Sequence, residues 1–565
     1  MYASRLIAIL LFFNTAVSAA APPQEEPSSK SGVVGERIKK EADERLKPKP
    51  EEPVIQREPG PVEQPAVPAV QFVLKDVVLQ GNTVLPTRVF VRLIDAYRNR
   101  EVTVDDLQKL AGEIEQEYRR RGYVTTIAYL PPQRIAEGQV TIQIVEGRLG
   151  EISVEGNRYF KTSRILWYWL LKTGDVVRYR DIRKSLARMN DHPNRNVQAL
   201  LLAGKAPGTT DVVLKVQDRL PLQLGSQWDR QGTPSIGLFR YGFSTGYNNL
   251  FGWDDRLVLG TVFGKDFGAV YTQYLVPVTP YGTTATSGFS HSQVSPQRQF
   301  KPFGINGISQ TYSAGVDQSL VEEEGVSLGM RLGLEFKDSR TKVQSGTSRR
   351  DRLRVIQIGP HLRMTDAWGS WVAHNEYSFG IKGLGATSED NPLAGRPGAP
   401  PDFFKVEFQL ARLQRMPWQT QLIASLQTQL SPSKLLPQEE LYLGGADTVR
   451  GYPEGDYLAD QGVVARLEYV VPCRFLPAEW RLPHATVPLR DQLQLVSFLD
   501  RGYGRLRAIT EEERTSRNLM GVGGGLRLSI NQSFSARIEW GVNIGDRPLT
   551  SDSRSMLHFG IQYNG

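Results

Sequence analysis

Alternation of apolar and polar residues is the dominant pattern from about residue 219 to the end of the chain. Such segments are about ten residues long and are separated by Gly, Asn, Asp and Pro, which is typical of a transmembrane β-barrel. A soluble sandwich has the same period, but many strands, aromatic residues near strand ends and loops of unequal length favour the membrane. We predict about sixteen antiparallel strands in residues 219–565, an even number as expected for a barrel made from one chain.

The C-terminal segments show the alternation most clearly. One face holds Phe534, Ala536, Ile538, Trp540, Val542 and Ile544, and the other holds Ser535, Arg537, Glu539 and Asn543. Residues 404–410 and 557–563 repeat the pattern. In a barrel, the apolar face of each strand meets lipid and the polar face lines the lumen.

Residues 71–218 differ from the barrel region, because parts of them carry apolar residues at helical spacing. Residues 71–149 predict the order β-α-α-β-β, with apolar residues at helical spacing in 86–97 and 104–121. Residues 150–218 begin with Ile152-Ser153-Val154-Glu155-Gly156-Asn157, which is similar to Val77-Val78-Leu79-Gln80-Gly81-Asn82. We therefore predict two copies of a small α/β module of about 75 residues each, as expected of an internal repeat.

The N-terminal 70 residues divide into three parts. Residues 1–20 have the basic start, apolar core and small-residue cleavage zone of a secretory signal peptide. Residues 21–47 contain helix formers with opposite charges four apart, which predicts a solvated helix, and residues 48–70 are a Pro-rich, extended linker. A polar helix on such a tether suits a plug in a wet lumen, and a disordered tail is the alternative.

The composition narrows the classes of function. The chain has 565 residues, of which 40% are hydrophobic, and its net charge of +8 is spread along it, which does not favour a nucleic-acid partner. Cys473 is the only cysteine, so an intramolecular disulfide is excluded, and the six histidines lack ligand spacing. The glycine run at residues 521–525 lacks the helix context and the Lys-Ser/Thr of a phosphate loop. We therefore expect no catalytic residue, no metal and no cofactor, and hence no enzyme.

The most informative motif lies in residues 431–460, the longest loop between predicted barrel strands. This loop contains Val449-Arg450-Gly451-Tyr452 after two glycines, and Phe498-Leu499-Asp500-Arg501-Gly502 follows about fifty residues later. Asp500 shares the parity of Gln494 and Phe498, opposite Leu495 and Leu499, which places Asp500 in the lumen. A guanidinium matches a carboxylate with a fixed fork of hydrogen bonds, so we predict that Arg450 pairs with Asp500. Two separately solvated charges are the alternative.

The loop motif and its strand partners Phe498, Asp500 and Gly502 resemble the signature of the Omp85 superfamily. Within it, the chain resembles the two-partner secretion transporters (the TpsB family of haemolysin secretion and activation proteins). The resemblance extends to the α/β modules, which resemble the two POTRA domains of these transporters. Their matching segments are 118–123, 130–133 and 145–149 in the first module, and 194–197 and 207–211 in the second.

The resemblance implies an outer-membrane translocator whose POTRA domains, residues 71–149 and 150–218, lie in the periplasm. Its implied partners are a large secreted protein with an N-terminal secretion domain, outer-membrane lipid, and the barrel assembly machinery during biogenesis. The client would cross unfolded. An insertase for outer-membrane barrels, a passive porin and a soluble adhesive β-protein are the alternatives. Two modules and the N-terminal helix favour secretion over insertion, and porins lack both the modules and the arginine loop.

The first module also supplies candidate residues for client binding. A POTRA sheet edge can accept an unfolded strand by β-augmentation, and Tyr118, Arg119, Arg120, Arg121 and Tyr123 lie near such an edge. In the alternative interpretation, the two tyrosines pack the core and the three arginines end a solvated helix.

Overall fold

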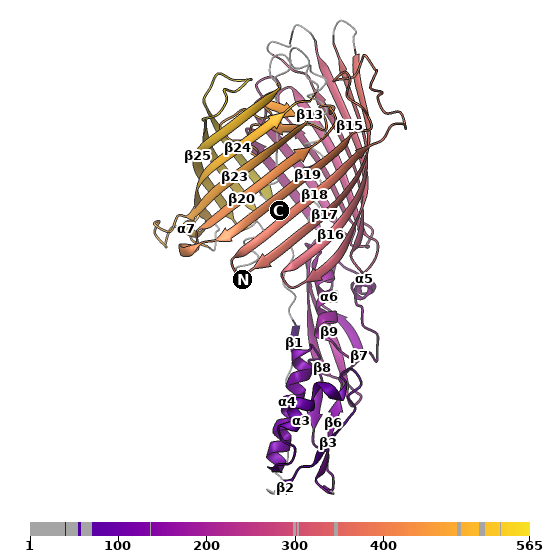
Figure 1. The fold of residues 1–565 in the computed structure, drawn as a ribbon. Coiled ribbons are helices and arrows are strands. Elements are labelled where there is room, and N and C mark those ends of the chain that lie inside the picture. The colour runs from indigo at the N-terminus through magenta and orange to yellow at the C-terminus, as the bar shows by residue number, and fades with distance from the viewer. Residues whose placement is uncertain are drawn as a thin grey trace. The chain divides into compact units, whose positions relative to one another are not determined.

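The computed structural model describes residues 40, 55–57, 71–135, 137–297, 301, 304–343, 348–482, 487–507, 515–531 and 533–565. The predicted signal peptide therefore lies outside the described residues, as do the predicted N-terminal helix apart from Lys40 and most of the linker. The chain forms two compact units, Pro50–Leu220 and a unit that contains Pro221–Gly565. Figure 1 labels their helices and strands.

The first α/β module packs two helical segments on a small sheet. Its elements are β2 (Phe72–Val73), β3 (Asp76–Gln80), η2 (Thr87–Val89), α3 (Val91–Asp95), β4 (Glu101–Val102), α4 (Val104–Arg120), β5 (Ile127–Tyr129) and β6 (Gln139–Val145). A capping box formed by Thr103 and Asp106 starts α4, and Leu107, Leu110 and Ile114 bury its apolar face. The sheet order is β3-β6-β5.

The second module repeats this plan and gains a strand from the linker. Its own elements are β7 (Arg148–Glu155), α5 (Thr162–Trp167), α6 (Tyr179–Asn190), β8 (Arg195–Ala203) and β9 (Thr209–Asp218). Part of the predicted extended linker forms β1 (Ile55–Arg57), which pairs in parallel with β8 and gives the sheet order β1-β8-β9-β7.

A shared turn explains the internal repeat. Gly81 and Gly156 adopt φ of 95° and 86°, and each is followed by an asparagine whose side-chain amide donates to a backbone carbonyl three residues later. A carboxylate then accepts hydrogen bonds from the backbone N–H groups of the turn. This carboxylate is Glu146 in the first module and Asp218 in the second. The repeated Gly-Asn pair thus marks the same strand-to-helix connection twice.

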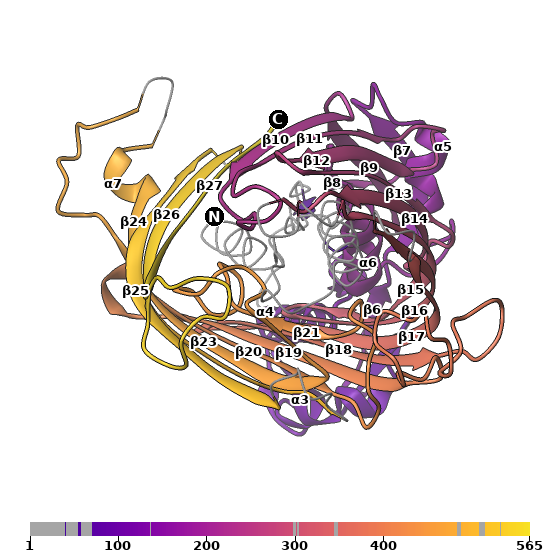
Figure 2. The same ribbon diagram turned by 90° about the horizontal axis from the view of Figure 1, so that it is seen from above.

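The described strands between Leu222 and Asn564 form a closed barrel of sixteen antiparallel strands, which confirms the predicted fold class. The strands are β10 (Leu222–Asp229), β11 (Arg240–Asn248), β12 (Arg256–Phe263), β13 (Phe267–Pro277), β14 (Thr283–Val294), β15 (Asn306–Glu323), β16 (Val326–Lys342), β17 (Ser348–Asp366), β18 (Gly369–Gly380), β19 (Phe404–Arg415), β20 (Gln421–Leu430), β23 (Gln461–Pro472), β24 (Leu493–Arg505), β25 (Ser516–Ile530), β26 (Phe534–Asn543) and β27 (Ser555–Asn564). Pairing of β10 with β27 closes the ring, which Figure 2 shows from above.

Side-chain burial separates the two faces of the barrel wall as the alternation predicts. On β24, Leu495 and Leu499 are exposed, whereas Val496, Phe498 and Asp500 are buried. On β26, Ile538 and Trp540 are exposed and Glu539 is buried between them. Among the described residues, no helix combines the length and apolar composition needed to span a bilayer.

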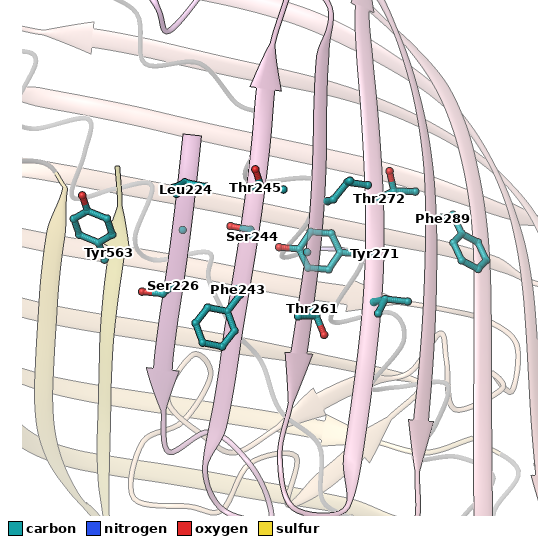
Figure 3. A pocket seen from close by; sticks show the side chains of 14 residues that line it. Leu224, Ser226, Phe243, Ser244, Thr245, Thr261, Tyr271, Thr272, Phe289 and Tyr563 are labelled. Atoms are coloured by element: carbon teal, nitrogen blue, oxygen red, sulfur yellow. The ribbon is translucent and has the colours of Figure 1, made fainter. Parts of the chain in front are cut away.

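A shallow apolar groove of about 810 Å³ runs over strands β10–β14 and β27 (Figure 3). Exposed large side chains such as Leu224, Phe243 and Tyr563 border it. Small residues, Ser226, Thr245 and Thr261, lie between them on the same strands. The groove therefore belongs to the outward, lipid-facing surface of the wall.

Candidate functional site

The loop between β20 and β23 is the candidate site, because its tip is buried. A two-stranded stem, β21 (Leu441–Leu443) and β22 (Tyr457–Ala459), carries a tip formed by residues 444–456. Gly444, Gly445 and Gly451 adopt φ of 103°, 107° and 91°, a region that favours glycine, so they allow the tip to fold back tightly. Val449, Arg450 and Tyr452 have no exposed surface.

Arg450 binds Asp500 of β24 through a two-pronged ion pair. Its Nε donates to Oδ2 and its Nη2 donates to Oδ1, both at 2.7 Å, and the Arg450 backbone N–H donates to Oδ2 at 3.1 Å. The planar guanidinium and the carboxylate match in this geometry, which an ammonium cannot reproduce. The predicted contact between the two residues is therefore present in the fold.

Two further carboxylates complete the surroundings of the guanidinium. Arg450 Nη1 lies 2.7 Å from Glu468 of β23 and 3.1 Å from Glu539 of β26. Arg527 of β25 bridges the same two glutamates. Arg466 lies 3.3 Å from Glu468 and 3.6 Å from Asp500. Three arginines thus face three acids, so this group of six residues is neutral as a whole.

The neighbours of Arg450 in the motif fix the tip in position. The Arg450 guanidinium carbon lies 3.5 Å from the centre of the Phe498 ring, a cation–π contact. The Tyr452 hydroxyl donates to the Asp546 carbonyl at 2.8 Å. The Gly451 N–H donates to His558 Nε2 at 3.3 Å, which ties the tip to the last strand.

Glycines on the lumen wall make room for the tip. A Cβ on Gly521 of β25 would lie 1.9 Å from the Arg450 carbonyl oxygen, and one on Gly541 of β26 would lie 2.6 Å from the Gly451 nitrogen. On Gly502 of β24, a Cβ would lie 2.7 Å from Val449 Cγ2. The tip therefore rests directly on the backbone of three neighbouring strands.

A second set of ion pairs holds the start of the loop. Glu439 receives hydrogen bonds at 2.7 Å from both Lys337 and Lys405, which come from β16 and β19. Arg396 donates to Glu440 and to Asp460 at 2.7 and 2.6 Å. The loop is thus tied to different stretches of the wall at its base and at its tip.

The sequence singled out Arg450 and Asp500 but did not single out Glu468, Glu539 or the contacts at the loop base. Glu539 was placed on the polar face of its strand, which is the signal that could have marked it. Its pairing with Arg450 depends on the register of β25 and β26, which alternation within one strand does not reveal.

Comparisons with known proteins agree with this architecture. A model of the family described as "Haemolysin secretion/activation protein ShlB/FhaC/HecB" matches residues 208–528, more than half of the chain. The chain belongs to this family. A model of the ShlB-type POTRA domain matches residues 72–147. The family consists of outer-membrane transporters that secrete a partner protein, and their POTRA domains lie in the periplasm.

Individual relatives cover most of the transporter. This chain is 24% identical over 485 residues to the heme/hemopexin transporter protein HuxB of Haemophilus influenzae (strain 86-028NP), and the match covers 81% of each chain. It is 26% identical over 408 residues to the outer membrane transporter CdiB of Dickeya dadantii, covering 70% of this chain and 72% of the other.

Solved structures share the fold at lower identity. CdiB from Escherichia coli has a TM-score of 0.69 at 19% identity and covers 90% of this chain and 93% of its own. BamA from Haemophilus ducreyi lacking POTRA domains 1-3 has a TM-score of 0.55 at 13% identity, and the match covers 87% of this chain and 100% of the BamA chain. These likenesses establish the barrel fold.

The candidate client-binding residues of the first POTRA domain fall into two groups. Tyr118 is completely buried, stacks on Phe90 and donates to Glu146 at 2.9 Å; burial and this carboxylate raise the pKa of its hydroxyl. Tyr118 is therefore a core residue and cannot contact a client, which corrects that part of the prediction. Tyr123 is half-buried against the same core.

The three arginines of the same motif remain at the surface. Arg119 pairs with Glu115, whereas Arg120 and Arg121 both pair with Glu117 within or beside α4. Exposed helical pairs of this kind contribute little to stability, about 0.3–0.5 kcal/mol each, so they could be exchanged for other partners.

Proposed function

We propose that the loop between β20 and β23 is the element that holds the secretion pore in its resting state, with Arg450 as its anchor. The observation that carries this proposal is the burial of Arg450 among Asp500, Glu468 and Glu539, three carboxylates from three strands of the wall. A loop joined to the wall by charge pairs can be released when water or a polar chain replaces those partners.

The balance of charge suits a reversible anchor. Charges buried without partners are very unfavourable, but here three arginines and three acids compensate one another. Once water reaches the network, separating an arginine from an acid costs much less free energy than in the dry state, because water solvates both charges. We infer that the resting state and the transporting state differ in the hydration of this network.

We further propose that the client first binds the open edge of the first POTRA sheet. In the described part of the chain, β5 pairs with β6 on one side and with no strand on the other. Ile127 and Tyr129 expose 40% and 42% of their surfaces along this short edge. An extended client segment could bond to the free backbone and cover both side chains. In the second domain, β1 already pairs with β8.

Introducing positive charge at this edge is the test. We expect I127K/Y129K to weaken binding of the isolated secretion domain of the partner about tenfold, because two desolvated lysines oppose strand addition by at least about 1.4 kcal/mol. The measurement is a binding titration with the full-length purified transporter. V78K provides the matched control, because Val78 is similarly exposed, at 42%, on strand β3 at the opposite edge. Equal weakening by V78K would show that the β5 edge has no special role.

The N-terminal helix is proposed to be a lumen plug. Lys40, the described residue of the predicted helix, is helical, and its Nζ lies 3.8 Å from Glu407, whose side chain faces the lumen on β19. Removal of residues 35–47 is expected to raise single-channel conductance in planar bilayers, because an aqueous path then opens. A conductance unchanged by this deletion would assign the segment to a tail instead.

We propose that transport requires no catalytic step by this chain. Its partner would be a large exported protein recognised through an N-terminal secretion domain, and the barrel assembly machinery would insert the barrel. HuxB and CdiB, which are similar over most of their lengths, are both named as transporters.

A further inference from the structure

The outward faces of β16 and β17 change abruptly from apolar to basic. On β16, Met330, Leu332, Leu334 and Phe336 are exposed at alternate positions, and the same row continues with Asp338, Arg340 and Lys342. The row on β17 passes from Ile358 and Ile356 to Arg354, Arg352 and Arg350. We call Arg340, Lys342, Arg350, Arg352 and Arg354 the basic cluster.

The basic cluster lies at the cell-surface side of the outer membrane. The POTRA domains are periplasmic, so the chain enters the barrel at Leu222 from that side and each later strand reverses direction. The connection that follows β16 is therefore extracellular. β16 has 17 residues and β17 has 19, whereas about 9–11 residues cross the bilayer, so both strands reach beyond the apolar band.

The strand register brings like charges together. Arg340 lies directly opposite Arg350, and Asp338 lies opposite Arg352. Like charges facing each other across a strand pair destabilise a sheet unless an anion lies between them. Asp338 is the acid in contact with the cluster: it forms a two-pronged pair with Arg350 and lies 3.5 Å from Arg352.

Arg354 donates to the carbonyls of Leu384, Lys337 and Leu353, whereas two other cations of the cluster are available for another partner. Among the described residues, Arg340 and Lys342 form no ion pair. The loop after β18 packs along β17, since Thr387 accepts from the Arg352 N–H, and its exposed acids Glu389 and Asp390 form no described ion pair with the cluster. Five cations thus face one bonded carboxylate at the boundary between the apolar band and water.

We propose that the basic cluster binds the phosphate groups of a phosphorylated glycolipid in the outer leaflet. Arginine forks suit phosphate oxygens, and the apolar row that ends at Phe336 would contact the acyl chains below. Phe336 also supports the cluster directly, because the Arg354 guanidinium lies 5.0 Å from the centre of its ring. Charged residues lie at the membrane surface and apolar residues lie toward the bilayer centre, which matches the order of phosphate and acyl chains in such a lipid.

Native mass spectrometry of the full-length protein in detergent tests the assignment, with hexa-acylated bisphosphoryl lipid A as the probe. We expect a saturable adduct whose apparent affinity falls about tenfold in R340Q/R350Q, since two charge-assisted contacts are lost. The same lipid stripped of both phosphates, phosphatidylglycerol, and inorganic phosphate form the comparison arms. Equal binding of any of these three would overturn the glycolipid assignment.

The control variant is R412Q/R474Q, which removes the same charge at the opposite rim. Arg412 faces outward on β19 and is paired with Asp366 at 2.7 Å, and Arg474 follows the periplasmic end of β23. This variant is expected to bind lipid A as the parent does, and an equal loss would overturn the proposal. Heat-modifiable mobility on gels checks assembly. If R340Q/R350Q does not assemble, R340Q alone carries the test, with about a threefold loss expected.

Discussion

The R450A variant is expected to lose nearly all secretion while its barrel still inserts into the outer membrane. Removing the guanidinium leaves Asp500, Glu468 and Glu539 without their shared partner in a buried site. Breaking a buried pair in this way costs about 3–5 kcal/mol when water is excluded. The tip should then leave the wall, so the loop loses its anchor in the lumen. Secreted partner in the medium and heat-modifiable barrel in the membrane fraction are the two measurements.

Substitutions of Asp500 and Arg450 distinguish the effect of this ion pair on secretion from the effect of the surrounding charges. We expect D500A to reduce secretion less than R450A, because Glu468 and Glu539 still compensate the arginine. R450K should restore secretion only in part, since an ammonium lacks the planar fork. In the R450A/D500A double variant, the secretion defect should be little larger than in R450A alone. The double-mutant cycle then gives an interaction energy between the two residues of at least about 1 kcal/mol. Additive defects would mean that the two residues act independently.

The second large effect is expected from G521V, which leaves every charge in place. A Cβ at this position would lie 1.9 Å from the Arg450 carbonyl oxygen, so the tip must move away from β25. Trypsin should then cleave the peptide bond after the displaced Arg450, which the native burial of this residue prevents. We expect secretion to fall at least about tenfold, comparable with the loss of one buried charge contact.

The matched control is G268V in strand β13, where an added Cβ meets no atom within 4 Å. It introduces the same β-branched side chain into a barrel strand, so general effects on strand formation are shared. Secretion and trypsin resistance should stay at the parent level in G268V. If both variants behave alike, then close approach of the loop to Gly521 is not what secretion requires.

The barrel and the central ion pair were predictable because each rests on a local pattern. Alternation placed Asp500 in the lumen, and the glycines around Arg450 marked a tight loop. The identity of the other carboxylates was not predictable, because Glu468 and Glu539 approach Arg450 only through the stagger of neighbouring strands.

Two other features were only partly predictable, for different reasons. Strand β1 has three residues inside a Pro-rich segment, and its pairing with β8 determines its conformation more than its own composition does. Tyr118 stands directly before a run of three arginines, which made it a candidate for client binding. Its position on α4 continues the four-residue spacing of Leu110 and Ile114, which is the pattern of a core residue.

The wide spacing of the loop contacts along the chain has a consequence for biogenesis. Arg450 is separated by 50 residues from Asp500 and by 89 from Glu539, and Gly451 is separated by 107 from His558. Contacts this distant in sequence form late, because long segments must be ordered first. The loop cannot dock until the last two strands are in place. Docking therefore marks the end of folding, and an incomplete barrel would keep its arginine loop in water.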